Sequence, residues 1–220
     1  MNPGRSMSRR SESAEGGTER ARALVARAWR ARREALESPP TDDATLVAVM
    51  SGVEADLVRA CEMYEHAGAR SGLSAALGKL GHVALDLDDT DRARALFEES
   101  VAVAREAEDP LRLAHAVRHL GQVNHRLGRL ESAGTCYEEA LDLYDRAGTA
   151  HPVDHANALR PMAALREELG DVRGARLMWR WAAELYGSAG VEEGVDECEA
   201  RLSGLAQAEP GDRGAGEQGR

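Results

Sequence analysis

Apolar residues along most of the chain recur every three or four positions, which is the spacing of one face of an α-helix. No stretch shows the alternation of apolar and polar residues that is typical of a β-strand. The pattern begins in residues 19–37, which we expect to form a helix that follows Thr18 and stops before Pro39-Pro40. The sequence therefore predicts an all-α fold.

The same pattern of residue types returns after 40 residues and again after a further 42. Six columns share this register: Leu77, Val117 and Leu159; Leu80, Leu120 and Met162; Leu87, Leu127 and Leu169; Ala93, Ala133 and Ala175; Phe97, Tyr137 and Trp179; and Ser100, Ala140 and Ala182. Agreement between independent columns indicates an internal repeat. Each unit is expected to be two helices joined by a turn. Its small residues let the helices approach closely, and its aromatic residue fills the space between hairpins.

The repeat and its flanks predict how the chain is organised. A helical domain over residues 18–206 is expected to lie between a disordered basic arm and a disordered tail, since both ends are poor in apolar residues. The predicted segments are the arm 1–17, a degenerate unit 41–70, repeats at 73–109, 113–150 and 155–189, a capping helix 191–206, and the tail 207–220. We also expect Pro161 to kink or restart the helix in which it falls.

The second unit carries Leu120-Gly121, a turn glycine at Gly128, and Ala133, Tyr137 and Ala140 in the second helix. This arrangement resembles the tetratricopeptide repeat. The third unit departs from it, since Ala163 replaces the glycine. The resemblance implies a right-handed α-solenoid of helical hairpins with a C-terminal capping helix. The units are longer than the usual length of about 34 residues, as in the extended variety of bacterial repeats.

In the family, four positions of each first helix line a concave groove, and the resemblance implies that polar residues occupy them here. The candidate binding residues are His82, His115, Arg118, Gln122, His125, Arg126, Asn157 and Arg160. Arginine can pair with a carboxylate or phosphate, and amides can bond a peptide backbone. Histidines such as His119 are expected to gain charge as the pH falls toward about 6.

The resemblance, together with the chemistry of these residues, implies a non-catalytic cytoplasmic adaptor that binds a protein or peptide with an acidic segment or a free C-terminus. No cofactor and no membrane span is expected, because no nucleotide-binding motif and no long apolar run occurs. The net charge of −10 argues against nucleic-acid binding. Cys61, Cys136 and Cys198 form no CxxC pair, which favours reduced thiols.

Two alternatives stay open from the sequence. One alternative is a self-associating regulatory module, such as a homodimer, that uses the arginine-rich arm and a partly exposed Trp181. The other is a metal enzyme, because His115 and His119 are four residues apart and share a helix face. The acidic run from Asp86 to Asp91 lacks the glycine of a calcium loop, so it predicts a turn in which Thr90 or Asp91 caps the next helix.

Overall fold

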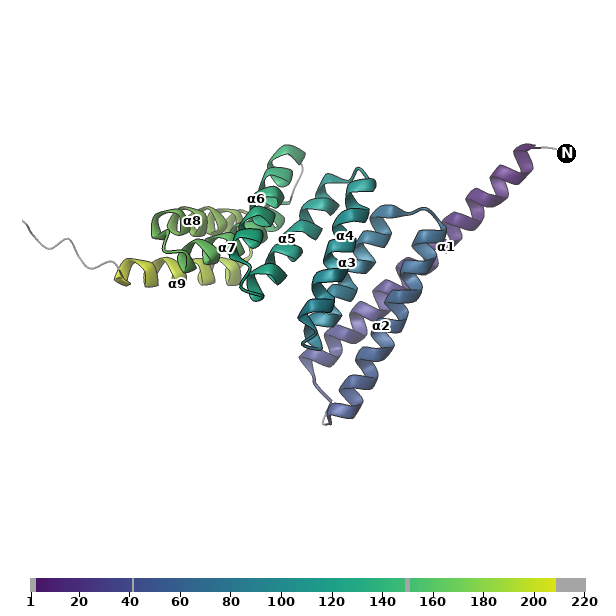
Figure 1. Ribbon diagram of the computed structural model, residues 1–220, viewed down its shortest axis with the longest axis horizontal. Coiled ribbons are helices and arrows are strands. Elements are labelled where there is room, and N and C mark those ends of the chain that lie inside the picture. Colours follow the sequence, from purple (N-terminus) through teal and green to yellow (C-terminus); the bar gives the residue numbers. More distant parts are fainter. Residues whose placement is uncertain (1–2, 41, 149–150, 209–220) are drawn as a thin grey trace, which may run out of the picture. The chain divides into compact units, whose positions relative to one another are not determined.

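The computed structural model describes residues 3–40, 42–148 and 151–208, with side chains from Glu15 onward. The chain forms two compact units, Met1–Ala147 and Gly148–Arg220. No β-strand occurs in the described residues, which are almost entirely helical (Figure 1). The helices are α1 Pro3–Glu37, α2 Asp43–His66, α3 Arg70–Asp86, α4 Thr90–Glu106, α5 Pro110–Arg126, α6 Leu130–Ala147, α7 Pro152–Glu168, α8 Val172–Ser188 and α9 Glu192–Ala208.

Within each unit the helices pack as hairpins. In the first unit α1 packs against α2, α3 against α4, and α5 against α6 (Figure 1). The hairpins are stacked, since α2 also packs on α3 and α4 on α5. In the second unit α7 packs against α8, and α8 packs against α9. The predicted all-α fold of repeated helical hairpins is confirmed.

Most of the columns that reveal the repeat are core positions. Ala93, Ala133 and Ala175 are fully buried, and so are the aromatic residues Phe97 and Tyr137. The column of Leu87, Leu127 and Leu169 differs, because Leu87 is 40% and Leu169 is 60% exposed. These leucines end the first helix of each unit, where the chain turns away from the packed face. The register of a repeat thus identifies equivalent positions, but it does not show which of them are buried.

Glycine at the predicted position allows the aromatic column to pack against the first helix. A Cβ atom added at Gly81 would lie 2.8 Å from ring atoms of Phe97, and one at Gly121 would lie 2.6 Å from Tyr137. Both distances are too short for real contacts. Because Gly81 and Gly121 have no side chain, α3 can pack closely against α4, and α5 can pack closely against α6.

The N-terminal helix differs from its prediction. Residues 3–17, expected to be disordered, continue α1 toward the N-terminus. Four serines and three glycines in this stretch are poor helix formers, so its composition does not account for the helix. Pro3 stands in the first turn, where proline is tolerated. Residues 1–2 and 209–220 of the predicted arm and tail lie outside the described residues. The region of the degenerate unit contains one helix, α2, and the helix that completes its hairpin is α1.

Aspartates begin several helices. Asp89 accepts a hydrogen bond from the Arg92 amide at 3.1 Å, so Asp89 caps α4 rather than the predicted Thr90 or Asp91. Asp109 caps α5 in the same way by accepting from the Arg112 amide at 2.9 Å. The helix with Pro161 does not restart there, because α7 is continuous from Pro152 to Glu168.

Candidate ligand-binding site

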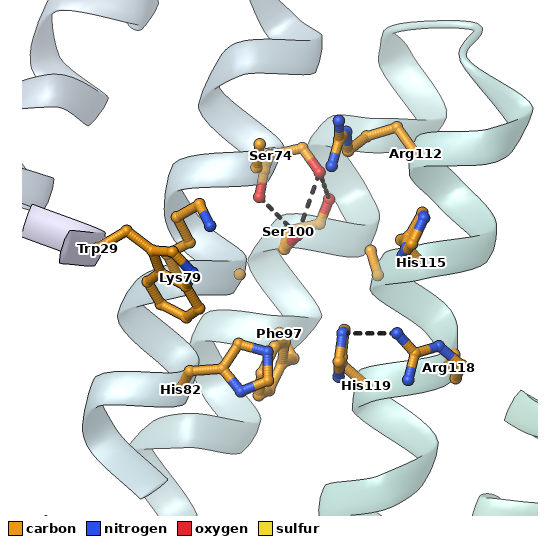
Figure 2. Close-up of a pocket in the computed structure, with 13 residues that line it drawn as sticks. Trp29, Ser74, Lys79, His82, Phe97, Ser100, Arg112, His115, Arg118 and His119 are labelled. Atoms are coloured by element: carbon orange, nitrogen blue, oxygen red, sulfur yellow. Dashed lines mark hydrogen bonds between the residues drawn. The ribbon is translucent and has the colours of Figure 1, made fainter. Parts of the chain in front are cut away.

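A pocket of 310 Å³ opens in the first unit among α1, α3, α4 and α5. Figure 2 shows its side chains converging from α3 and α5, with Trp29 of α1 at one edge. The lining residues are Trp29, Ser74, Ala75, Gly78, Lys79, His82, Phe97, Ser100, Arg112, His115, Ala116, Arg118 and His119. On α5 the lining includes Arg112, His115 and His119, at spacings of three and four residues. One helix face therefore points into the pocket.

Aromatic rings form the inner wall of the pocket. The Phe97 ring is fully buried and stacks on the His119 ring, with 5.5 Å between the ring centroids. The His82 ring meets Phe97 edge-on at 5.4 Å and His119 edge-on at 4.5 Å. Trp29 contacts the other side of His82 at 5.9 Å. The wall is therefore built from closely packed rings that bring little net charge of their own.

Hydrogen bonds fix the protonation of His119. Arg118 Nη2 lies 3.0 Å from His119 Nε2, as Figure 2 shows, and a guanidinium can only donate. Nε2 is therefore the acceptor, and Nδ1–H donates to Gln122 Oε1 at 2.8 Å. Gln122 does not line the pocket, but it orients a residue that does. Both ring nitrogens of His119 are engaged, which leaves neither free to bind a metal.

Burial keeps the histidines of the wall neutral. It lowers the pKa of His119 well below 6.5, and the neighbouring Arg118 and His82 add to this effect. Burial, with the charges of Arg32 and Arg118, lowers the pKa of His82 to about 4. The expectation that His119 gains charge near pH 6 is therefore wrong, because a buried imidazolium beside an arginine is unfavourable.

Three cationic side chains supply the positive charge of the pocket: Lys79 of α3, and Arg112 and Arg118 of α5. Lys79 Nζ lies 3.6 Å from the centroid of the Trp29 ring, a cation–π contact. Burial and the nearby charges of Arg112 and Arg32 lower the pKa of Lys79 to about 8. None of the pocket-lining residues is acidic.

The two arginines have donors that no protein group satisfies. The Nε atoms of Arg112 and Arg118 are buried, and neither has a hydrogen-bond partner in the described part of the chain. An unsatisfied buried donor costs about 1–3 kcal/mol. By contrast, Arg32 at the margin of the pocket forms a bidentate pair with Asp86, with Nη2 2.8 Å from Oδ1. Because the Nε atoms of Arg112 and Arg118 are closed to solvent, an anionic ligand would bind these two arginines through the other donors of their guanidinium groups.

The structure brings together only part of the predicted site. His82, His115 and Arg118 line the pocket, and Gln122 supports it through His119. His125 instead contacts the Tyr137 ring at 6.3 Å, and Arg126 is exposed in the last turn of α5.

Asn157 and Arg160 belong to the second unit and are bonded within it. Tyr186 Oη donates to Asn157 Oδ1 at 2.6 Å, and Arg160 Nη2 donates to Glu197 Oε1 at 2.8 Å. Asn157 and Arg160 therefore already form hydrogen bonds within the protein, although the sequence predicted them to be available for a ligand.

The sequence prediction missed several lining residues, among them Trp29, Lys79 and Arg112. Lys79 carries a signal that could have revealed it, because it is the only lysine among the 28 cationic residues of the chain. Arg112 is three residues before His115, so the helical stripe of candidates could have been extended by one turn. Trp29 lies outside the repeats and gave no signal beyond its size.

Neither cysteine nor metal chemistry is evident in the described residues. Burial raises the pKa of Cys61 to about 12 and that of Cys198 to about 11, so both thiols are protonated at neutral pH. Where the structure describes side chains, no group of three or more His, Cys, Asp or Glu residues is placed to hold a metal ion. The described helices also include none with the length and apolar character needed to cross a membrane.

Comparisons with known proteins identify the repeat. The family model described as "Tetratricopeptide repeat" matches residues 72–146, the stretch that contains α3 to α6. No curated protein sequence is significantly similar to the chain.

Similar folds occur among solved structures. A STAND protein with a tetratricopeptide repeat sensor from Pyrococcus horikoshii is 15% identical with a TM-score of 0.65 over 89% of this chain, which spans 28% of that protein. A putative kinesin light chain with repeats from Podosopora anserina is 12% identical with a TM-score of 0.57, covering 86% of this chain and 95% of that one. BtubC from P. vanneervenii is 18% identical with a TM-score of 0.51, covering 92% and 95%. At these identities the likeness concerns the fold alone.

Proposed function

Because residues 72–146 belong to the tetratricopeptide repeat family, we propose that the protein is a non-catalytic adaptor that binds a segment of another protein in the pocket of α1, α3 and α5. A repeat scaffold of this kind generally presents surfaces to other proteins. The observation that carries the proposal is the pocket itself, which is lined by Lys79, Arg112 and Arg118 and by no acidic side chain. The expected partner is a segment with acidic side chains or a free C-terminal carboxylate.

The bound segment would lie along the face formed by α3 and α5. Its anionic group would accept from the guanidinium groups of Arg112 and Arg118, which line the pocket. The rings of His82, Phe97 and His119 already pack against one another without a ligand. Such preorganisation lowers the entropic cost of association. His125, Arg126, Asn157 and Arg160 would lie outside this contact, although the sequence grouped them with it.

A peptide-binding experiment tests the proposal. Wild-type protein and the double variant Lys79→Gln/Arg112→Gln are exposed to a library of acidic peptides, each with a free or an amidated C-terminus. The matched control is Arg180→Gln, which removes one cation from an exposed position on α8. We expect wild type and control to retain the same peptides and the double variant to lose them. Peptides retained equally by all three proteins, with circular dichroism showing that each is folded, would contradict the proposal.

A second candidate function is self-association through α8. Leu177 and Trp181 are 63% and 44% exposed and stand one helical turn apart, so they form an apolar strip in the second unit. Trp181 also contacts the His155 ring, with 4.9 Å between the centroids. Light scattering at several protein concentrations tests this role. Association that Leu177→Ser abolishes would support it, and a monomer at all concentrations would exclude it.

A further inference from the structure

The charge of the pocket exceeds what a single carboxylate can neutralise. Lys79, Arg112 and Arg118 contribute three cationic groups, while the neighbouring Arg32 is neutralised by Asp86. A carboxylate carries one negative charge and a phosphate monoester about 1.5 to 2 at pH 7. In a partly buried pocket walled by rings, electrostatic interactions are stronger than in water. The difference between one and two negative charges is therefore significant for affinity.

The donors in the pocket also suit phosphate. Arginine has a planar fork of donors that matches the oxygens of a phosphate, and the lysine ammonium acts as a compact charge. Among the pocket-lining residues, Arg112 and Arg118 have buried Nε atoms without an acceptor in the described part of the chain, and Arg160 and Arg166 of the second unit share this feature. A phosphate monoester has three terminal oxygens and can accept from more than one of these cationic groups.

Neutral groups in the pocket are less suited to binding a ligand by hydrogen bonds. Ser74 Oγ donates to the Ser100 carbonyl at 3.0 Å, and Ser100 Oγ donates to the Ser74 carbonyl at 2.9 Å (Figure 2). The two hydroxyl hydrogens are therefore already used. The His119 ring is held by Arg118 and Gln122. Recognition at this point depends chiefly on the three cations, and thus on the charge of the ligand.

We propose that the pocket binds the phosphate group of a phosphorylated side chain in the bound protein segment. This inference rests on the proposed function, because it names the anionic group that the segment carries. The pocket volume of 310 Å³ is at the lower end of the range for ligand sites, about 300–1,000 Å³. That space suits one side chain and its phosphate rather than a large cofactor.

Calorimetric titration of the full chain with two small probes tests the choice of anion. The probes are N-acetyl-O-phosphoserine amide and N-acetylglutamate amide, which differ in their side chains and share a blocked backbone. We expect the phosphate probe to bind at least about tenfold tighter, which corresponds to about 1.4 kcal/mol. Equal affinities for the two probes, or no binding of the phosphate probe, would overturn the inference.

Variants locate the binding site. Arg112→Gln and Lys79→Gln are each expected to weaken binding of the phosphate probe about tenfold, and Arg180→Gln is expected to leave it unchanged. Lys79→Gln keeps the inference testable if Arg112→Gln does not fold, because Lys79 is only partly buried. An unchanged affinity in a folded Lys79→Gln or Arg112→Gln protein would place the phosphate elsewhere.

Phosphatase treatment separates this inference from the proposed function. If a peptide or protein binds through the pocket equally well before and after treatment, and the phosphate probe has no advantage, the inference fails while the proposed function stands. If the phosphate probe binds through the pocket but no peptide or protein does, the proposed function fails. The ligands would then be small phosphate monoesters.

Discussion

Arg118 in the first unit and Arg160 in the second occupy the same position of successive repeats, 42 residues apart, yet their surroundings differ. Arg118 is buried beside His119, with no carboxylate partner in the described residues. Arg160 donates to Glu197 of α9 at 2.8 Å. Arg201 of α9 likewise pairs with Glu167 of α7, at 2.6 Å.

This difference shows how α9 affects the charged groups of α7. In the second unit α9 supplies both a carboxylate for α7 and a cation for α7, so the charged groups of that face are paired within the protein. Such partly exposed ion pairs add little stability, about 0–1 kcal/mol each. Their main consequence is that fewer donors remain for a ligand. A repeat position is therefore available for binding only where no neighbouring helix provides the counter-charge.

The largest expected effect is on the stability of the protein and concerns His82 in the inner wall of the pocket. The folded pKa of His82 is about 4, against 6.5 for an ordinary histidine. The unfolded chain therefore binds the proton more strongly, and stability is present above pH 6.5 and lost as the pH falls to 4. The loss attributable to His82 is about 3 kcal/mol. Urea unfolding at pH 7 and pH 4 measures it.

His82→Gln provides the control for this prediction. The variant has no titrating group at position 82, so its stability should fall less between pH 7 and pH 4 than that of the wild type. Carboxylates that titrate in the same range contribute equally to both proteins. Identical pH dependence in the two proteins would show that His82 is not a buried neutral group.

A second prediction compares the repeats at the glycine of the first helix. A methyl group at Gly121 would meet the buried Tyr137 ring at 2.6 Å, so Gly121→Ala should destabilise the protein by about 1–3 kcal/mol. The third repeat has Ala163 at this position, and that residue is fully buried. Ala163→Gly should cost about 0.5–1 kcal/mol, the ordinary cost of glycine in a helix. Thermal unfolding of both variants measures the difference, and a harmless Gly121→Ala would show that the hairpin is less closely packed.

The fold could be predicted because it depends on periodic properties of the sequence. The apolar spacing and the columns around Ala93 and Phe97 identify helices, hairpins and core residues without any knowledge of distant contacts. The disorder predicted for residues 3–17 differs from the structure, in which they continue α1 although serine and glycine make up nearly half of them.

The site was less predictable, because a ligand site depends on which charges remain unpaired. Sequence register made Arg118 and Arg160 equivalent, but Arg118 contacts His119, whereas Arg160 contacts Tyr186 of α8 and Glu197 of α9. The repeat pattern also gave no indication of Trp29, which lines the pocket from α1, a helix outside the predicted repeats. Which side chains are neutralised is a property of packing between segments far apart in the chain, and no local pattern encodes it.

A third prediction makes the second unit resemble the first. Glu197→Gln removes the charge that Arg160 faces, so Arg160 becomes available to an anion. The stability cost should be below about 1 kcal/mol, since both side chains are partly exposed. Titration with N-acetyl-O-phosphoserine amide should then show weak additional binding, whereas Glu199→Gln on the exposed side of α9 should not. No additional binding in Glu197→Gln would show that one unpaired arginine is insufficient to bind the phosphate probe.

The smallest expected effect concerns the turns that connect the hairpins. At the repeat spacing, Gly68, Gly148 and Gly190 have positive φ values of 66°, 60° and 71°, but the same position between α4 and α5 is Glu108, with φ of 51°. A side chain in this left-handed region costs roughly 1–2 kcal/mol, and the greater entropy of glycine in the unfolded chain offsets part of that cost. Glu108→Gly should therefore stabilise the protein by about 0.5 kcal/mol in urea unfolding. Gly190→Ala, the reverse change in the second unit, should destabilise it. A destabilising Glu108→Gly would mean that the Glu108 side chain contributes more through its own interactions than its backbone conformation costs.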